Sequence, residues 1–385
     1  MTANKMRAAL TAVFLGTAMA TGAMAILTVP ASAAIRAAVG TPLSEAKSLA
    51  AAGNYKGAMA KVNEAEAVSG KTPEETNIIS QMKSYIGVKS GDASIGGAAG
   101  AKAKFANDYA AKKYADVIAD ADVLKKAGAL DTANMQVIAQ AYYLSGNKKG
   151  CISYIKGTLG NAGGDATQML LMRCAYDAGD DVTQREALET LVSHTGKTEY
   201  WSDLLKLSER SKGMADHDTL DVYRLKMLTG TISGKDEYTL LAQLAVQMGF
   251  PAEAQAVVEK GQAAKVLNDD RSTRLLTLAK TQSAAKAATM DKDLAAAKAA
   301  PNGDALVKIG EAQWGMGKAA DAVATLQAAM AKPLTDKLDA QLRLGMAQYS
   351  AGQKPASTKT FDAVKGPDTD KTVMIAHLWS LYSKK

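Results

Sequence analysis

The sequence predicts an all-α fold in which antiparallel helix pairs stack in a row, and three observations support this prediction. First, the chain of 385 residues is rich in alanine but has only 5% aromatic residues and 8 prolines, which is typical of helices that pack through small side chains. Second, glycines and apolar residues recur with a spacing near 35 residues. Third, the hydrophobic and charged fractions, 47% and 22%, are those of a folded protein rather than a disordered one.

The clearest repeat consists of two adjacent units near the C-terminus. Each unit has a small residue, an aromatic residue, a turn glycine, a second small residue and a large apolar residue at matching positions, namely Gly310, Trp314, Gly317, Ala322 and Leu326, then Gly345, Tyr349, Gly352, Ser357 and Phe361. We expect Gly317 and Gly352 to close the turns with positive φ. We expect Gly310 and Ala322 to let the two helices of one pair approach closely. The pattern is similar to that of the tetratricopeptide repeat (TPR), a helix–turn–helix unit of about 34 residues.

Partial copies of this pattern occur upstream, in residues 49–65, 138–155, 172–180 and 240–258. Two other stretches interrupt it. Residues 94–100 are rich in glycine and predict a loop or a loosened helix start, because they lack the spacing of a phosphate-binding loop. Residues 196–239 fit helices but lack the turn glycine, which predicts a divergent hairpin between two sub-arrays.

The segment from Tyr200 to Gly261 also resembles a group of exported tetratricopeptide-repeat proteins of Gram-negative bacteria. The resemblance rests on residues 200–205, 221–226 and 249–254, and with the flanking repeats it covers about two-thirds of the chain. It implies a TPR-like α-solenoid, that is, a right-handed superhelix of antiparallel helix pairs. It also implies a periplasmic location and supplies no catalytic residues.

These patterns divide the chain into four parts. Residues 1–33 predict a signal peptide, residues 34–195 an N-terminal helical array, residues 196–265 divergent hairpins that join the arrays, and residues 266–385 C-terminal repeats with a capping helix. The last helix, in residues 373–382, is amphipathic and has no partner hairpin. We expect it to cover the apolar face of the last repeat, and an exposed docking helix is the alternative.

The N-terminus has the features of an export signal. Lys5 and Arg7 precede an uncharged stretch, and Ala31-Ser32-Ala33 offers a cleavage site before Ala34. We therefore expect a periplasmic protein. The alternative is an inner-membrane anchor formed by residues 8–29, because this apolar run is long enough to span a bilayer. Since no later run of this kind follows, we expect no membrane span after cleavage.

The charge distribution argues against a nucleic-acid partner. Without residues 1–33 the chain has 44 basic and 39 acidic residues, a net charge of +5. Its lysines alternate with acids, as on a solvated helix face, and no cluster of arginines with aromatic residues occurs.

The sequence contains no motif typical of a catalytic or metal site. His194, His217 and His377 show no pairing at metal-ligand spacing and are predicted to lie at the surface or at helix ends. We interpret the adjacent acids as helix caps: Glu74 and Glu75, Asp180 and Asp181, Asp269 and Asp270. We therefore expect no enzyme activity, no metal and no cofactor.

The two cysteines, Cys151 and Cys174, form a candidate disulfide. In the repeat register Cys151 begins the second helix of one unit and Cys174 lies in the first helix of the next. Those helices are neighbours, and an oxidising periplasm permits a bond. The alternative is two separate buried thiols, since free cysteine is often a core residue.

By the same resemblance, the first helix of each repeat lines a concave groove. Its groove-facing residues would be Gln136, Gln140, Tyr143, Asp177, Glu311, Trp314 and Tyr349, together with Thr167, Leu170 and Met346. Amides and aromatic rings suit an extended peptide, whereas the alternative role of these residues is packing. The sequence thus predicts a periplasmic scaffold that binds a protein or peptide of the cell envelope. The alternative is an accessory solenoid of a polysaccharide-export or cell-wall assembly complex.

Overall fold

The computed structural model describes residues 35–367 and 369–385, and within these residues the chain is all-helical, without strands. This confirms the predicted all-α class, an α-solenoid of helices packed in adjacent pairs. The predicted signal peptide and its cleavage site fall on residues 1–34, outside the described part. No described helix is long and apolar enough to cross a membrane.

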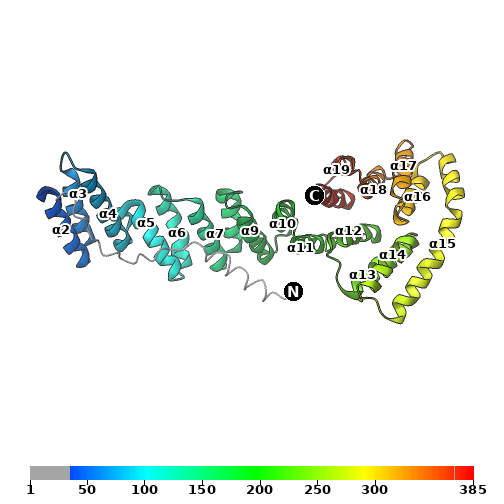
Figure 1. Cartoon of the computed structure of the whole chain (residues 1–385), viewed down its shortest axis with the longest axis horizontal. Coiled ribbons are helices and arrows are strands. Elements are labelled where there is room, and N and C mark those ends of the chain that lie inside the picture. The colour runs from blue at the N-terminus through cyan, green and yellow to red at the C-terminus, as the bar shows by residue number, and fades with distance from the viewer. Residues whose placement is uncertain (1–34, 368) are drawn as a thin grey trace. The chain divides into compact units, whose positions relative to one another are not determined.

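The chain forms two compact units with a boundary between Leu130 and Asp131. The described helices of the first unit are α2 (Ala37–Ala51), α3 (Tyr55–Ala67), α4 (Pro73–Ser90), α5 (Ala93–Ala110) and α6 (Tyr114–Lys126). Within this unit, helices that are adjacent in the chain pack against each other (Figure 1). The core of α2–α4 consists of aliphatic residues, with Val39, Val62 and Ile86 fully buried, and Phe105 is buried in α5.

The second unit holds the remaining helices. They are α7 (Thr132–Leu144), α8 (Lys148–Tyr154) with the π-helical turn η1 (Ile155–Leu159), α9 (Gly164–Ala178), α10 (Asp181–Thr195), α11 (Thr198–Glu209), α12 (Asp216–Thr229), α13 (Gly234–Gln247), α14 (Pro251–Ala263), α15 (Asp270–Ala299), α16 (Asp304–Gly315), α17 (Ala319–Met330), α18 (Lys337–Ser350), α19 (Lys354–Asp362) and α20 (Lys371–Ser383). The unit boundary at Leu130 differs from the divisions at residues 195 and 265 that the sequence pattern suggests.

The repeat glycines have the expected roles. Gly317 and Gly352 adopt φ of 76° and 77° in the turns after α16 and α18, which confirms the predicted left-handed turns. A Cβ at Gly310 would lie 2.6 Å from Leu326 Cγ, so α16 and α17 approach closely only because position 310 lacks a side chain.

The glycine-rich stretch 94–100 belongs to a helix rather than a loop. It forms the start of α5, which is interrupted at Gly97 by non-helical backbone angles. The expected loosened helix start is therefore confirmed. A Cβ at Gly96 would lie only 2.2 Å from Gly87 Cα, so these glycines permit the close crossing of α4 and α5.

The predicted helix caps are also present. Asp180 and Asp269 are the N-cap residues of α10 and α15 and accept hydrogen bonds from backbone N–H groups three residues ahead. Glu75 completes a capping box with Thr72 at the start of α4.

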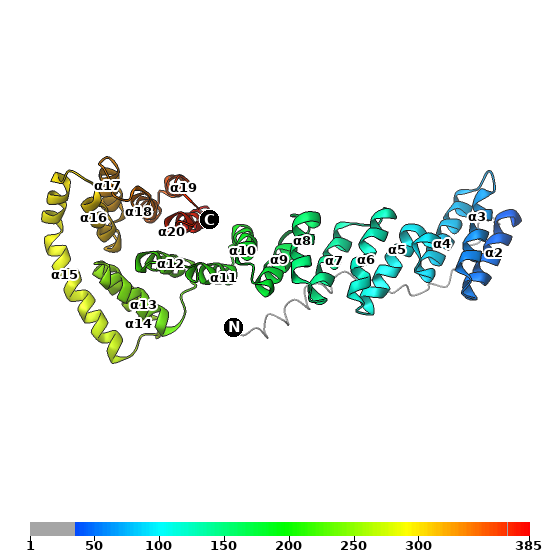
Figure 2. The same ribbon diagram turned by 180° about the vertical axis from the view of Figure 1, so that it is seen from behind.

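The C-terminal helix α20 packs against two parts of the second unit. It covers the last repeat, as expected of a cap, and it also contacts α10 and α12 (Figure 2). Trp379 is fully buried in a core that combines residues 188–225 with residues 342–379. The Tyr382 hydroxyl donates to the Leu228 carbonyl oxygen at 3.2 Å. The second unit is therefore closed, because its C-terminal helix packs back onto α10 and α12.

Helix α12 lies at the centre of this closure. All seven residues from Leu220 to Lys226 are buried, charged ones included. The fully buried Lys226 ammonium lies 2.7 Å from a carboxylate oxygen of Glu209 and 2.6 Å from one of Glu237. Segment 196–239 is helical as expected, and its helix α12 packs against α11, α13 and the C-terminal helix α20.

Candidate functional site

The second unit contains a cleft of about 820 Å³ bounded by α12, α13, α14, α15, α16 and the turn into α17. Its apolar lining includes Met227, Leu241, Val257, Trp314 and Met316. This volume lies within the usual range for ligand-binding clefts.

The long helix α15 explains why the cleft is open. It runs between the α13–α14 pair and the α16–α17 pair (Figure 1). Its buried residues lie towards its two ends, and from Lys280 to Thr289 none is buried. Only the small side chains of Ser283 and Ala287 line the cleft from this stretch, so α15 forms a wall without filling the space.

An arginine and a tryptophan meet at the cleft. Arg224 donates from Nε to Glu253 Oε1 at 2.8 Å and from Nη2 to Glu253 Oε2 at 2.6 Å. Its guanidinium carbon lies 4.7 Å from the centroid of the Trp314 ring, within the range of a cation–π contact. The half-buried Trp314 also donates from Nε1 to Ser350 Oγ at 2.7 Å. The ring is thus held in a fixed orientation at the cleft.

A buried network of charges extends from Arg224 away from the cleft. Arg224 Nη1 donates to Asp221 Oδ1 at 2.8 Å and to Glu311 Oε1 at 2.6 Å. From α18, Arg343 Nη1 lies 2.5 Å from Asp221 Oδ1, and its Nη2 donates to Asp339 Oδ1 at 2.6 Å. The network joins α12, α14, α16 and α18 through side chains whose unpaired burial would be costly.

Burial and charge oppose each other in this network. Burial works to raise the pKa of the Glu311 carboxyl, but the charges of Arg343 and Arg224 outweigh it and hold this pKa far below its ordinary value. At Asp339 burial prevails over the charge of Arg343, and the pKa is raised. Burial alone would lower the pKa of His217, yet its hydrogen bond with Glu311 raises that pKa above the ordinary value.

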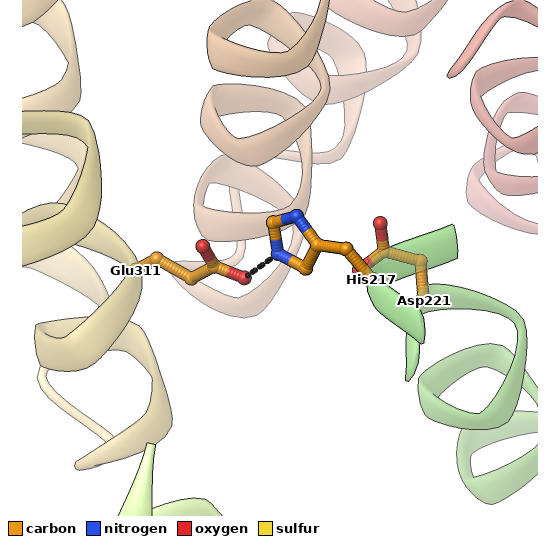
Figure 3. Close-up of side chains that lie close together, drawn as sticks. All are labelled: His217, Asp221 and Glu311. Carbon is orange, nitrogen blue, oxygen red and sulfur yellow. Dashed lines mark hydrogen bonds and ion pairs between the residues drawn. The ribbon is translucent and has the colours of Figure 1, made fainter. Parts of the chain in front are cut away.

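His217 lies in the first turn of α12 and its side chain is 35% exposed, as expected of a residue near a helix end, but it also contacts buried charged side chains. Its Nε2 lies 3.1 Å from Glu311 Oε1 (Figure 3). Its Nδ1 lies 3.3 Å from Arg343 Nη2. His217 and Asp221 are four residues apart on α12, so the prediction that no histidine has a neighbour at metal-ligand spacing is wrong. One ligand atom each from His217, Asp221 and Glu311 lie within 4.8 Å of one another.

This donor set does not suit a resident cation. Arg224 already contacts both carboxylates, and Arg343 lies 2.5 Å from Asp221 Oδ1. A metal ion would have to displace two buried guanidinium groups and would leave their charges unpaired. We therefore interpret the cluster as an ion-pair network that holds α12 to α16 and α18.

The predicted groove residues fall into two groups. In the first, Gln136 donates from Nε2 to Thr167 Oγ1 at 3.3 Å, and the Tyr143 hydroxyl donates to Asp177 Oδ2 at 2.8 Å. The half-buried Gln140 lies between them on α7. These side chains link or border α7 and α9, and they do not line the cleft.

The second group lies in the C-terminal repeats. Trp314 lines the cleft, whereas Glu311 is only 3% exposed and is occupied by the charge network. The ring of Tyr349 packs against that of Tyr382, with centroids 5.3 Å apart. Of the seven predicted positions, Trp314 alone is placed to touch a ligand in the cleft.

Cys151 and Cys174 are joined by a disulfide in the structure. Both residues are fully buried, and their Cα atoms lie 6.2 Å apart. The bond links α8 to α9 and therefore two successive repeats.

The other two histidines contact carboxylates at helix surfaces. His194 Nδ1, in the last turn of α10, lies 2.8 Å from Asp165 Oδ1. His377 Nε2 lies 3.0 Å from Glu189 Oε2 and contributes to the contact between α20 and α10.

No protein-family model matches the chain, and no similar protein was found among the curated proteins compared with it.

Proposed function

We propose that this protein is a non-catalytic scaffold of the bacterial cell envelope whose second unit binds a segment of a partner protein in the cleft. The observation that carries the proposal is the cleft itself, an apolar space of about 820 Å³ with an oriented tryptophan at its edge. Aromatic and methionine side chains at a concave apolar site favour the binding of apolar peptide side chains.

A binding role also fits the chemistry around the cleft. Arg224, which contacts the Trp314 ring, and Glu253 are engaged with each other in a bidentate pair. Such a pair orients the wall of the cleft and engages both groups within the protein.

The periplasmic location is part of the proposal. It is supported by the signal-like residues 1–33 and by the cysteine pair, since disulfides persist in oxidising compartments.

A pair of matched variants tests the binding role. Ala287→Arg places a large side chain in the cleft, whereas Ala285→Arg places the same side chain on the same exposed stretch of α15 but outside the cleft. A photo-crosslinking residue at Met316 is expected to form one covalent adduct with an envelope protein. Ala287→Arg should abolish that adduct, and Ala285→Arg should leave it.

An adduct that persists in Ala287→Arg would contradict the proposal, as would the absence of any adduct. Recovery of polysaccharide-export components alone would instead support the alternative, an accessory role in polymer export.

A further inference from the structure

We propose that the cleft recognises an acidic amphipathic peptide, in which a large apolar side chain enters the cleft and a neighbouring carboxylate pairs with Lys260 and Lys318. This inference rests on the proposed function and specifies the chemistry of the partner.

The charges at the cleft carry this inference. Its two acids are already engaged: Glu253 pairs with Arg224 at 2.6 Å, and Glu259 lies 3.2 Å from Lys280 Nζ. Glu259 also accepts a hydrogen bond from Gln255 at 3.1 Å. No acid that lines the cleft is therefore left to attract a basic ligand.

Two lysines also line the cleft, and they take no part in these ion pairs. Lys260 extends from α14 and Lys318 from the turn between α16 and α17, and both are exposed. Within the described residues neither has an ion-pair partner. Because the other charges cancel in pairs, the rim of the cleft is positive, and an anionic partner complements it.

The apolar lining determines the rest of the ligand. Leu241 and Val257 come from α13 and α14, while Met227 and Met316 add flexible side chains that adjust to ligands of different shape. A highly charged ligand without an apolar group would leave this surface unfilled. A carboxylate next to a leucine, phenylalanine or tryptophan side chain satisfies both features.

Peptide selection tests the inference on the purified chain. A random peptide display library is first depleted on an Ala287→Trp variant, which fills the cleft without adding a charge, and then selected on the unaltered protein. We expect the selected peptides to be enriched in aspartate and glutamate beside large apolar residues. We expect a selected peptide to bind about tenfold more weakly when its acids are replaced by amides.

A charge-reversed variant sharpens the test. The double substitution Lys260→Glu/Lys318→Glu should select lysine- and arginine-containing peptides in place of acidic ones. The control Lys292→Glu/Lys298→Glu makes the same change of net charge on α15, outside the cleft, and should preserve the acidic preference.

The outcomes separate the two proposals. Peptides that depend on the open cleft but show no acidic enrichment, or no change on charge reversal, overturn this inference and leave the proposed function standing. A selection that yields no peptide sensitive to Ala287→Trp overturns both.

Discussion

The two units differ in how far apart in the sequence their packed helices lie. In the described part of the first unit, each helix packs on its near neighbours, from α2 to α6. In the second unit, α10, α11 and α12 share a core with α18, α19 and α20. The first unit is therefore a sum of local interfaces, as in an ordinary repeat array. The second is stabilised by contacts that form only when distant repeats meet.

The ion pairs of the two units differ in burial. The buried acids Glu75 and Asp120 of the first unit pair with exposed cations, whereas the second unit buries both partners of several pairs. In the first unit, Lys61 pairs with Glu45 and Glu64 at the surface, and exposed pairs of this kind contribute little to stability. In the second unit, Arg224 and Arg343 are both 3% exposed or less. Substitutions of charged residues should therefore lower the stability of the second unit more than that of the first. All three tryptophans, Trp201, Trp314 and Trp379, lie in the second unit, so tryptophan fluorescence follows the unfolding of this unit alone.

The largest effect is expected from Arg224→Met. This change removes the cation that joins Asp221, Glu253 and Glu311, and only Asp221 and Glu311 keep Arg343 as a partner. It should lower the free energy of unfolding of the second unit by about 3–5 kcal/mol. Urea titration followed by tryptophan fluorescence measures it. Lys61→Met should change the stability of the first unit, followed by limited proteolysis, by less than about 1 kcal/mol. Equal losses would refute the division drawn between the units.

Removal of the disulfide should have the next largest effect. Cys151→Ala/Cys174→Ala opens a link between residues 23 apart in the sequence and should destabilise the second unit by about 2–4 kcal/mol. Tryptophan fluorescence should show the loss, while proteolysis of the first unit stays unchanged. The bond itself is checked by alkylation of the denatured, unreduced protein, and a mass increase at both thiols would show that it does not form.

A glycine substitution should affect the first unit alone. Gly96→Ala forces a methyl group against the Gly87 backbone and should cost about 1–3 kcal/mol, as overpacked contacts do. Faster proteolysis near α4 and α5, with an unchanged tryptophan transition, is the expected result. Gly40→Ala is the control, because its Cβ would make an ordinary contact 3.5 Å from Ile35. A stable Gly96→Ala protein would contradict the close crossing.

The smallest effect is a pH dependence from His217. Its pKa is raised in the folded protein, so its contribution to stability is fully present below its unfolded pKa, near 6.5, and is lost as pH rises through the folded value. We expect His217→Gln to reduce the difference in stability of the second unit between about pH 6 and pH 8. An unchanged difference in this variant would assign the dependence to other groups.

Local features of the fold were predictable because their causes are local. The turn at Gly317 needs only a residue that tolerates positive φ, and the crossing at Gly310 needs only a missing side chain. Each can be identified within one repeat of about 34 residues. The helical nature of residues 196–239 follows in the same way.

The closure of the second unit was not predictable from these patterns. Arg224 pairs with Glu311 across 87 residues, and no periodicity links the two positions. In the sequence alone, Asp221, Arg224 and Lys226 look like charged residues on a solvent-exposed helix face, although they are buried in the structure. One usable signal was missed: His217, Asp221 and Arg224 recur at spacings of four and three, which places them on one face of α12.

The position of α20 has a consequence for the order in which the chain acquires structure. Trp379 completes the core around α10, α11 and α12. This core therefore stays partly exposed until α20 has been synthesised and has packed against it. The first unit needs only neighbouring segments and can form early. Because contacts between distant segments slow folding, the second unit is expected to be the slower of the two. Until α20 arrives, it exposes apolar surface to chaperones and proteases.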